Sequence, residues 1–147
     1  MMLGDITSGA LPPGRYRLGV PTTVRALRDE LAVSDWLLRL VDGGAMTSRA
    51  SMFHEFAVAC DFPAWFGGNW DAFADCLRDL SWLPQAPLVI LWQRAGVFEE
   101  RAPGIWTTAN TVIATAIEDR VEAGLPSLYL LYPMDPLGRS DPGDGIL

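Results

Sequence analysis

Two short runs of aliphatic and aromatic residues constrain the fold of this chain more than any other feature. Residues 87–92 read Pro-Leu-Val-Ile-Leu-Trp and residues 128–132 read Leu-Tyr-Leu-Leu-Tyr, so neither run alternates apolar with polar side chains. A strand that is apolar on both sides needs cover on both faces, which is typical of parallel sheets flanked by helices. A third apolar run, residues 36–41, ends at the turn residues Asp42-Gly43-Gly44.

Segments with helical spacing of apolar residues separate these runs. The first three predicted helices follow residues that cap helices well, because their side-chain oxygens accept a backbone N–H of the first turn. The predicted helices run from Thr22 or Thr23 to about Val33, from Thr47 or Ser48 to about Cys60, from Asn69 to about Leu80, and from about Ile105 or Thr108 to Ala123. The pattern predicts an α/β fold, with a small three-stranded parallel sheet covered by helices.

The two ends of the chain differ from its middle. Residues 1–34 are predicted to form an N-terminal helical extension, in which residues 15–20 fit at most a short edge strand. Residues 35–132 then form one compact domain. Residues 133–147 are rich in Pro and Gly and are predicted to be a flexible tail.

The charge of the chain limits its partners. The formal net charge is -7 and the isoelectric point is about 4.5, whereas a protein that neutralises nucleic-acid phosphates needs clustered Lys and Arg. We therefore expect no nucleic acid, and a basic partner rather than an acidic one. Charge alone also fits an ordinary protein that a moderate negative charge keeps in solution. The chain shows neither a membrane-spanning run nor a signal peptide, so we expect a cytoplasmic protein with no membrane partner. A separate expectation is that the free protein is a monomer. Cys60 and Cys76 lack a CxxC spacing and are predicted to be reduced, buried thiols, and we expect no metal and no cofactor.

Residues 62–80 hold the most informative motif of the chain. Gly67-Gly68 allows a tight loop, and Asn69 is a good N-cap for the helix that follows. The apolar face of this helix is predicted to pack on the sheet through Trp70, Phe73, Leu77 and Leu80. The other side carries an acidic row at intervals of four residues, namely Asp71, Asp75 and Asp79. Each like-charged pair in this row costs a few tenths of a kcal/mol.

Three interpretations of this acidic row stay open at this point. Spacing alone favours an ordinary solvated helix face. A row of carboxylates beside a Trp-Phe-Gly-Gly loop also suits a basic, aromatic-friendly pocket on another protein. A metal site is the weakest interpretation, since three Asp at helical spacing without a His do not make a compact ligand cage.

The motif resembles the signature of the barstar family of ribonuclease inhibitors. The resemblance is carried by Phe62-Pro63, by the Trp65-Phe66-Gly67 loop, and by Asn69, Asp71-Ala72 and Asp75-Cys76-Leu77, and residues 87–92 resemble that family's second strand. Together these anchors span about Trp36 to Tyr132. The resemblance implies a three-stranded parallel sheet, and an inhibitor that lays the loop and the helix over a ribonuclease active site.

The resemblance also implies roles for single residues. Asp75 matches the family's central inhibitory aspartate, Asp71 a second acidic contact, and Trp65 the aromatic that stacks in the enzyme's cleft. Gly67 and Asn69 match loop contacts, and Glu118 or Asp119 falls near the remaining acidic contact. Two departures are Ala74, where the family often carries an aromatic, and Trp70, where it carries a smaller aliphatic. The predicted binding surface thus comprises Trp65, Gly67, Asn69, Trp70, Asp71, Ala74, Asp75, Asp79, Glu118 and Asp119.

The resemblance implies a basic, extracellular-type ribonuclease as the partner. Two alternatives remain, namely an immunity protein against a different toxin or nuclease, and a small enzyme. The enzyme alternative is chemically weak, because the chain has one His, His54, and lacks a Gly-x-Ser-x-Gly elbow, a phosphate loop and a metal triad.

Overall fold

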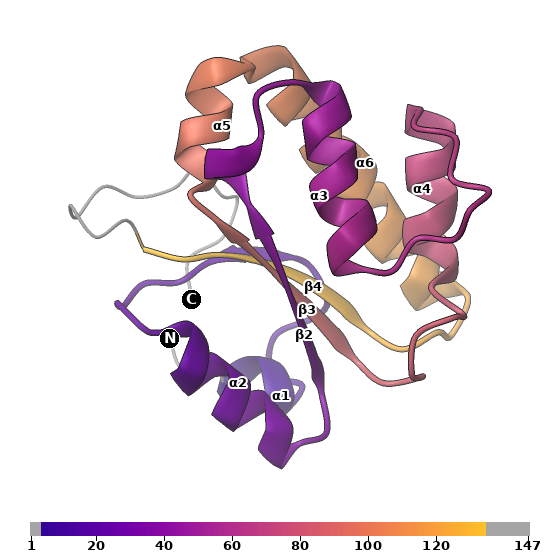
Figure 1. Cartoon of the computed structure of the whole chain (residues 1–147). Coiled ribbons are helices and arrows are strands. Elements are labelled where there is room, and N and C mark those ends of the chain that lie inside the picture. Colours follow the sequence, from indigo (N-terminus) through magenta and orange to yellow (C-terminus); the bar gives the residue numbers. More distant parts are fainter. Residues whose placement is uncertain (1–3, 135–147) are drawn as a thin grey trace.

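The computed structural model describes residues 4–134, and its centre is a four-stranded parallel sheet (Figure 1). The strand order is β1-β4-β3-β2, and the bounds are Arg15–Arg17 for β1, Leu37–Asp42 for β2, Leu88–Gln93 for β3 and Leu128–Tyr132 for β4. The prediction of a parallel sheet covered by helices is confirmed.

The predicted number of three strands is wrong, because β1 joins the sheet as a fourth strand. It lies at the edge beside β4, with Arg15 in register with Leu130 and Arg17 with Tyr132. An edge strand pairs on one side, and β1 consists of three residues with the polar sequence Arg-Tyr-Arg. From the sequence, residues 15–20 fit a short edge strand, and β1 occupies the first three of them. A segment this short and polar does not by itself show that it joins the sheet.

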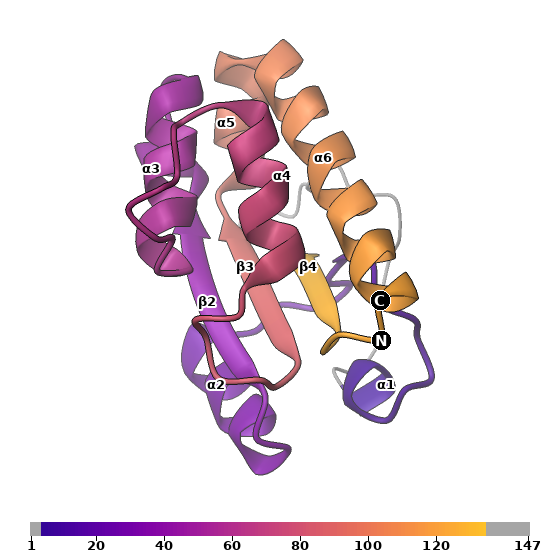
Figure 2. The ribbon, with the colours of Figure 1, turned by 90° about the vertical axis from the view of Figure 1, so that its right-hand side faces the viewer.

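The helices cover both faces of the sheet, as the apolar strands require. Helices α1 and α2 lie on one face, and α3, α4, α5 and α6 lie on the other (Figures 1 and 2). Their bounds are Gly4–Thr7, Val24–Val33, Arg49–Ala59, Trp70–Asp79, Ala95–Arg101 and Pro103–Glu122, and a short 3-10 helix η1 spans Gly43–Ala45. Because right-handed crossovers in opposite directions place their helices on opposite faces, the step from β1 to β2 puts α2 on the face opposite α3 to α6.

Alternate residues of the inner strands enter two separate cores. From β3, Leu88, Ile90 and Trp92 pack under the four-helix face, while Val89 and Leu91 pack under α1 and α2. Strand β4 divides in the same way. This is the period of two of a strand, with both sets of side chains apolar because both are buried.

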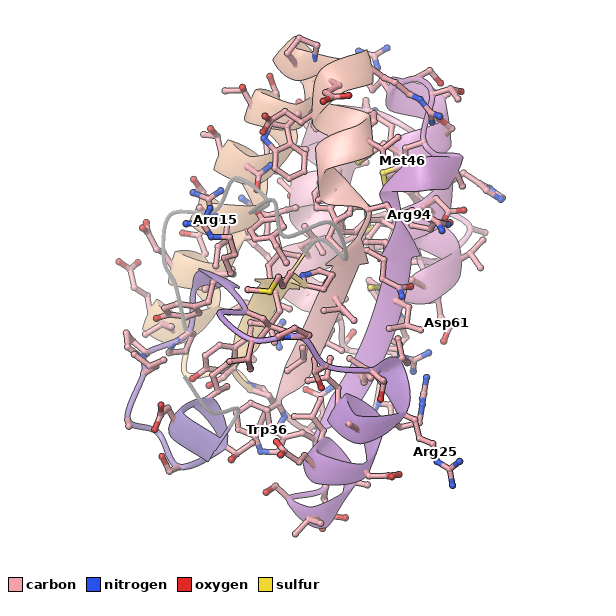
Figure 3. The ribbon with its side chains drawn as sticks, turned by 90° about the vertical axis from the view of Figure 1, so that its left-hand side faces the viewer. Arg15, Arg25, Trp36, Met46, Asp61 and Arg94 are labelled. Atoms are coloured by element: carbon pink, nitrogen blue, oxygen red, sulfur yellow. The ribbon has the colours of Figure 1, made fainter. Side chains whose placement is uncertain are left out.

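The first 34 residues supply half of the buried residues of the second core, and β3 and β4 supply the other half. Four apolar side chains from this part of the chain are buried against the sheet, namely Ile6, Leu18, Leu27 and Leu31. Figure 3 shows this side of the molecule, where Arg25 points away from α2 into solvent. The assignment of residues 1–34 to a separate extension, with a boundary at residue 35, stays a prediction. The predicted flexible tail falls, apart from residues 133 and 134, outside the described residues.

Three helices begin where their capping residues predict. Thr23 accepts a hydrogen bond from Ala26 N at 3.1 Å, Ser48 accepts one from Ser51 N at 3.2 Å, and Asn69 caps α4. Helix α3 buries Met52, Phe53 and Phe56 against the sheet, while Val58 on the same helix is exposed.

Between β3 and β4 the sequence predicts one helix, from residue 105 or 108, but the segment holds two helices. Helix α5 lies before the predicted helix, and α6 begins at Pro103. Proline suits the first helical position, because the N–H that it lacks would have no partner within the helix. Helix α5 is fixed from both ends. Arg94 Nε donates to Asp42 Oδ1 at 2.9 Å, and Arg101 Nη1 donates to the carbonyls of Gly44 and Met46 at 2.9 and 3.1 Å. These contacts link residues more than 50 positions apart, so local spacing could not indicate them.

Truncating the second core tests whether α2 belongs to the cooperative fold. Leu31 is fully buried, so Leu31→Ala is expected to lower the free energy of unfolding by about 2–5 kcal/mol. The matched control is Val33→Ala, because Val33 lies on the same helix and is largely exposed, and its effect is expected to stay within about 0.5 kcal/mol. Urea unfolding monitored by circular dichroism measures both, and equal effects would contradict this packing.

Candidate functional site

Helix α4 is anchored to the molecule through one face. Phe73 and Leu77 are buried in the larger core, and Cys76 is buried as well. Trp70 at the first turn packs edge-on against Phe53, with ring centroids 5.0 Å apart. Asn69 Oδ1 accepts the N–H of Ala72 at 2.8 Å, as the sequence predicts. The side of α4 that faces away from this core is therefore left for solvent or for a partner.

The loop at residues 61–69 leads from α3 to α4 along the outer surface of the helix layer (Figure 2). The ring of Phe66 fixes this loop on the aromatic residues beneath it. Phe66 packs edge-on against both Phe53 and Phe62, at centroid distances of 5.6 and 5.0 Å. Gly68 has a φ of +68°, a backbone conformation that favours glycine, so the second glycine of the predicted pair makes the turn into α4.

Trp65 is the exposed aromatic of this loop. Its side chain is 55% exposed, and its ring lies edge-on against Trp82, with centroids 6.1 Å apart. Trp82 is half-buried, and its Nε1 donates a hydrogen bond to the Cys60 carbonyl at 2.8 Å. A large apolar surface is thus presented to solvent on a fixed support, which is an arrangement that suits an anchor for a protein partner.

The acidic row lies on the outer side of α4, as its spacing predicts. Asp71, Asp75 and Asp79 are all exposed, with Asp75 at 56%. Asp71 in the first turn is favoured by the partial positive charge of the helix N-terminus. Asp75 and Asp79 lie too far along the helix to gain much from this charge, so any offset to their mutual repulsion comes from other groups.

Arg78 provides part of that offset and links α4 to α6. Its Nη2 donates to Asp75 Oδ1 in a short contact, and its Nη1 lies 3.5 Å from Asp119 Oδ2. Of the two late acids that the sequence analysis singled out, Asp119 is the one that contacts Arg78, while Glu118 beside it is exposed. The structure thus connects Asp75 on α4 with Asp119 on α6 through one guanidinium.

Arg120 fixes the C-terminal end of α4. Arg120 is buried, with 4% of its surface exposed, but its guanidinium has several acceptors. Its Nη1 donates to the carbonyls of Arg78 and Asp79, both at 3.0 Å. Nε and Nη2 donate to the Pro126 carbonyl at 3.2 and 2.9 Å. Burial lowers the pKa of Arg120, and nearby Asp79 raises it in part. An arginine stays charged in a protein, so a buried cation holds the last carbonyls of α4.

The remaining residues of the predicted binding surface differ in how far they are exposed. Gly67 and Asn69 are exposed in the loop, but the Asn69 side chain is occupied as the helix cap. Trp70 and Ala74 are half-buried, so each offers part of its surface. Their contacts with a partner stay predictions, as do those of the other residues of the predicted binding surface.

Sequence reasoning missed Arg78 and Arg120 as parts of this site. Arg78 could have been found from its position three residues after Asp75, since such pairs are neighbours on a helix. Arg120 lies three residues after Ile117 and seven after Ile113, both of which are buried, so helical spacing puts it on the buried face of α6. The carbonyls that it binds lie about 40 positions earlier, and no local pattern indicates them.

Groups suited to catalysis are few in the part of the chain that the structure describes. Burial raises the pKa of Cys60 to about 12 and that of Cys76 to about 11, so both are protonated at neutral pH and poor nucleophiles. Both cysteines are free, and His54 is exposed on α3. Within residues 4–134, no three His, Cys, Asp or Glu side chains converge as a metal site would require, and no helix has the length and hydropathy needed to cross a membrane.

These features define a class of protein, namely a parallel α/β domain that carries an acidic helix and an exposed aromatic loop on its outer surface. The family model described as Barstar (barnase inhibitor) matches residues 36–131, which is about two thirds of the chain. The chain belongs to the barstar family. The resemblance stated from residues 62–80 and 87–92 is therefore confirmed.

Other comparisons add little to this assignment. None of the curated proteins matches the chain. Among solved structures, one similar chain comes from the structure of Drosophila ORC bound to AT-rich DNA and Cdc6, with 15% sequence identity and a TM-score of 0.39. The match covers 90% of this chain and 43% of that chain, and likeness at this level carries no argument about function.

Replacing the buried arginine tests how α4 is held. Arg120→Ala leaves the carbonyls of Arg78 and Asp79 without their donor in a buried place, so we expect a loss of about 3 kcal/mol in the free energy of unfolding. The control is Arg49→Ala, because Arg49 is exposed on α3 and carries the same charge. Denaturant unfolding of both variants measures the difference, and a loss no larger than that of the control would contradict the role of Arg120.

The two thiols offer a pH-dependent test of burial. Because the folded-state pKa values lie near 12 and 11, alkylation by iodoacetamide at pH 8 is expected to be slow for both cysteines in the native protein. It should become fast in 6 M guanidinium chloride, where the thiols have their ordinary pKa of about 8.5. Mass spectrometry counts the modified sites over time, and rapid native modification at either cysteine would show that it is not buried.

Proposed function

We propose that this chain is a protein inhibitor of a ribonuclease. In this proposal the loop at residues 61–69 and the outer side of α4 cover the enzyme's active site and exclude RNA. The observation that carries the proposal is the exposed row of carboxylates on α4, in a chain of the family whose model is described as a barnase inhibitor. The chemistry is binding, and no step of it needs a catalytic group.

Charge is the first part of the proposed mechanism. A ribonuclease binds a polyanion, so its active site presents cationic groups to the phosphates. The exposed carboxylates of Asp71 and Asp75 offer the same sign of charge on a rigid helix. A net charge of -7 adds long-range attraction to a basic enzyme, which speeds encounter at low ionic strength.

The second part is an aromatic anchor. Trp65 offers most of its ring to a partner, and tryptophan is among the residues that contribute most to protein interfaces when buried in a pocket. Because Trp82 and the aromatic rings under the loop support it, little side-chain freedom is lost on binding. The proposed contact surface extends to α6 through Asp119 and Glu118, and includes Asp79, Gly67, Asn69, Trp70 and Ala74.

The proposal includes the setting of the protein. We expect a monomer in the cytoplasm, where it would bind a basic, extracellular-type ribonuclease before that enzyme reaches cellular RNA. Ala74 and Trp70 depart from the family's residues at their positions, so the groove of the target enzyme differs in shape from that of the family's usual partners. An immunity protein against another nuclease would use the same surface, and the choice of target decides between the two.

The direct test is a titration against a panel of small basic ribonucleases. Cleavage of a fluorogenic RNA is followed at rising protein concentration, at 50 and 300 mM salt. We expect stoichiometric inhibition of at least one enzyme, with slower association at the higher salt because exposed charges are screened. Lack of inhibition of every ribonuclease, combined with protection against a nuclease that cleaves DNA, would replace this proposal with the immunity alternative.

Removing the central carboxylate gives the sharpest single prediction for this surface. Asp75→Ala is expected to weaken inhibition by about 2–5 kcal/mol, because the partner's cation is then buried without its counter-ion. The matched control is Asp29→Ala, which makes the same change in net charge on α2, on the opposite face of the sheet. Thermal unfolding of each variant checks the fold. A folded Asp75→Ala protein that inhibits as well as the control would contradict the proposed site.

A further inference from the structure

Arg78 is a cation placed within the acidic surface that is proposed to meet a cationic partner. Its guanidinium contacts Asp75 on its own helix and lies 3.5 Å from Asp119 on α6. These two helices lie side by side in the layer (Figure 2). One of the carboxylates that a cationic partner would engage is therefore already paired in the free protein.

The exposure of the three side chains argues against a purely structural role for this link. Asp75, Arg78 and Asp119 are 56%, 43% and 38% exposed, and ion pairs in such positions are screened by water and contribute little to stability. Helix α4 is held by its buried apolar face and by Arg120 of α6, which binds the Arg78 carbonyl at 3.0 Å, so its attachment does not depend on the Arg78 side chain. The Arg78 side chain thus extends from a fixed backbone and can change partners without loosening the helix.

A partner that covers Asp75 also covers Arg78. A guanidinium has five N–H donors, and the loss of water around it is costly unless acceptors replace that water. A surface that offers cations alone leaves Arg78 facing like charges. A surface that sets a carboxylate beside its cations supplies the missing acceptor and can pair with the planar guanidinium through two hydrogen bonds.

We propose that Arg78 is the specificity-determining residue of this surface. It selects partners that present a carboxylate next to their cationic groups, and it selects against ligands that are cationic throughout. This inference rests on the proposed function, since it concerns the same surface. It makes Arg78 a repulsive element, of the kind by which interfaces distinguish partners of similar overall charge.

The test compares two partners with the wild type, Arg78→Ala and Arg25→Ala. Arg25 is exposed on α2 and points into solvent (Figure 3), so its removal makes the same change in net charge on the opposite face. The first probe is a hexa-arginine amide peptide, titrated by isothermal calorimetry at 20 mM salt. The second is the ribonuclease that the wild type inhibits. Arg78→Gln serves as a second variant if Arg78→Ala is poorly folded.

The two probes are expected to respond in opposite directions. Arg78→Ala should bind hexa-arginine about tenfold more tightly than Arg25→Ala does, because Asp75 is freed and a like charge is removed. The same variant should bind the ribonuclease about tenfold more weakly, because the enzyme's carboxylate loses its partner. Equal gains for the two variants with the peptide, or unchanged or tighter binding of Arg78→Ala to the ribonuclease, would overturn the proposal.

The failure of this inference can be told apart from the failure of the proposed function. If the wild type inhibits no ribonuclease, the proposed function fails, and the peptide titration alone decides whether Arg78 excludes cationic ligands. If the wild type inhibits a ribonuclease and Asp75→Ala abolishes this, while Arg78→Ala behaves like Arg25→Ala, the inhibitory site stands and the role of Arg78 is refuted.

Discussion

The rest of the structure depends on one constraint, which is that β3 and β4 are apolar on both faces and need cover on both. The four helices α3 to α6 supply one layer, and the first 34 residues supply most of the other through side chains such as Leu27 and Leu31. Covering both faces buries five of the six residues of β3. The consequence is a rigid central sheet on which the outer helices are held in fixed positions.

That rigidity explains how a surface of exposed charges can be well ordered. Helix α4 is held by its apolar face, by the Asn69 cap at its start and by the buried Arg120 at its end. The loop before it rests on a group of aromatic rings, so Trp65 is exposed without being free to move widely. Recognition by such a surface loses little conformational entropy, which favours tight binding from few contacts.

Much of this arrangement can be predicted from the sequence, because it follows from local patterns. Strands β2, β3 and β4, the caps of α2, α3 and α4 and the exposure of the acidic row all follow from spacing and residue type. The same patterns allow an edge strand at residues 15–20 but do not show that β1 joins the sheet, since it is three polar residues long. Helix α5 could not be predicted, because it is fixed by contacts to distant Asp42, Gly44 and Met46. The link from Arg78 to Asp119 likewise depends on how two helices pack, which no local pattern encodes.

The central claim is that the outer side of α4, with the loop before it and the adjacent part of α6, is the surface that covers a ribonuclease. Amide hydrogen exchange of the chain, alone and saturated with the inhibited enzyme, tests this most directly, because it locates the contact without altering any residue. We predict slower exchange on binding at residues 61–82 and around Asp119, with α2 unchanged. Slower exchange confined to α1, α2 and β1, with α4 unaffected, would contradict the account.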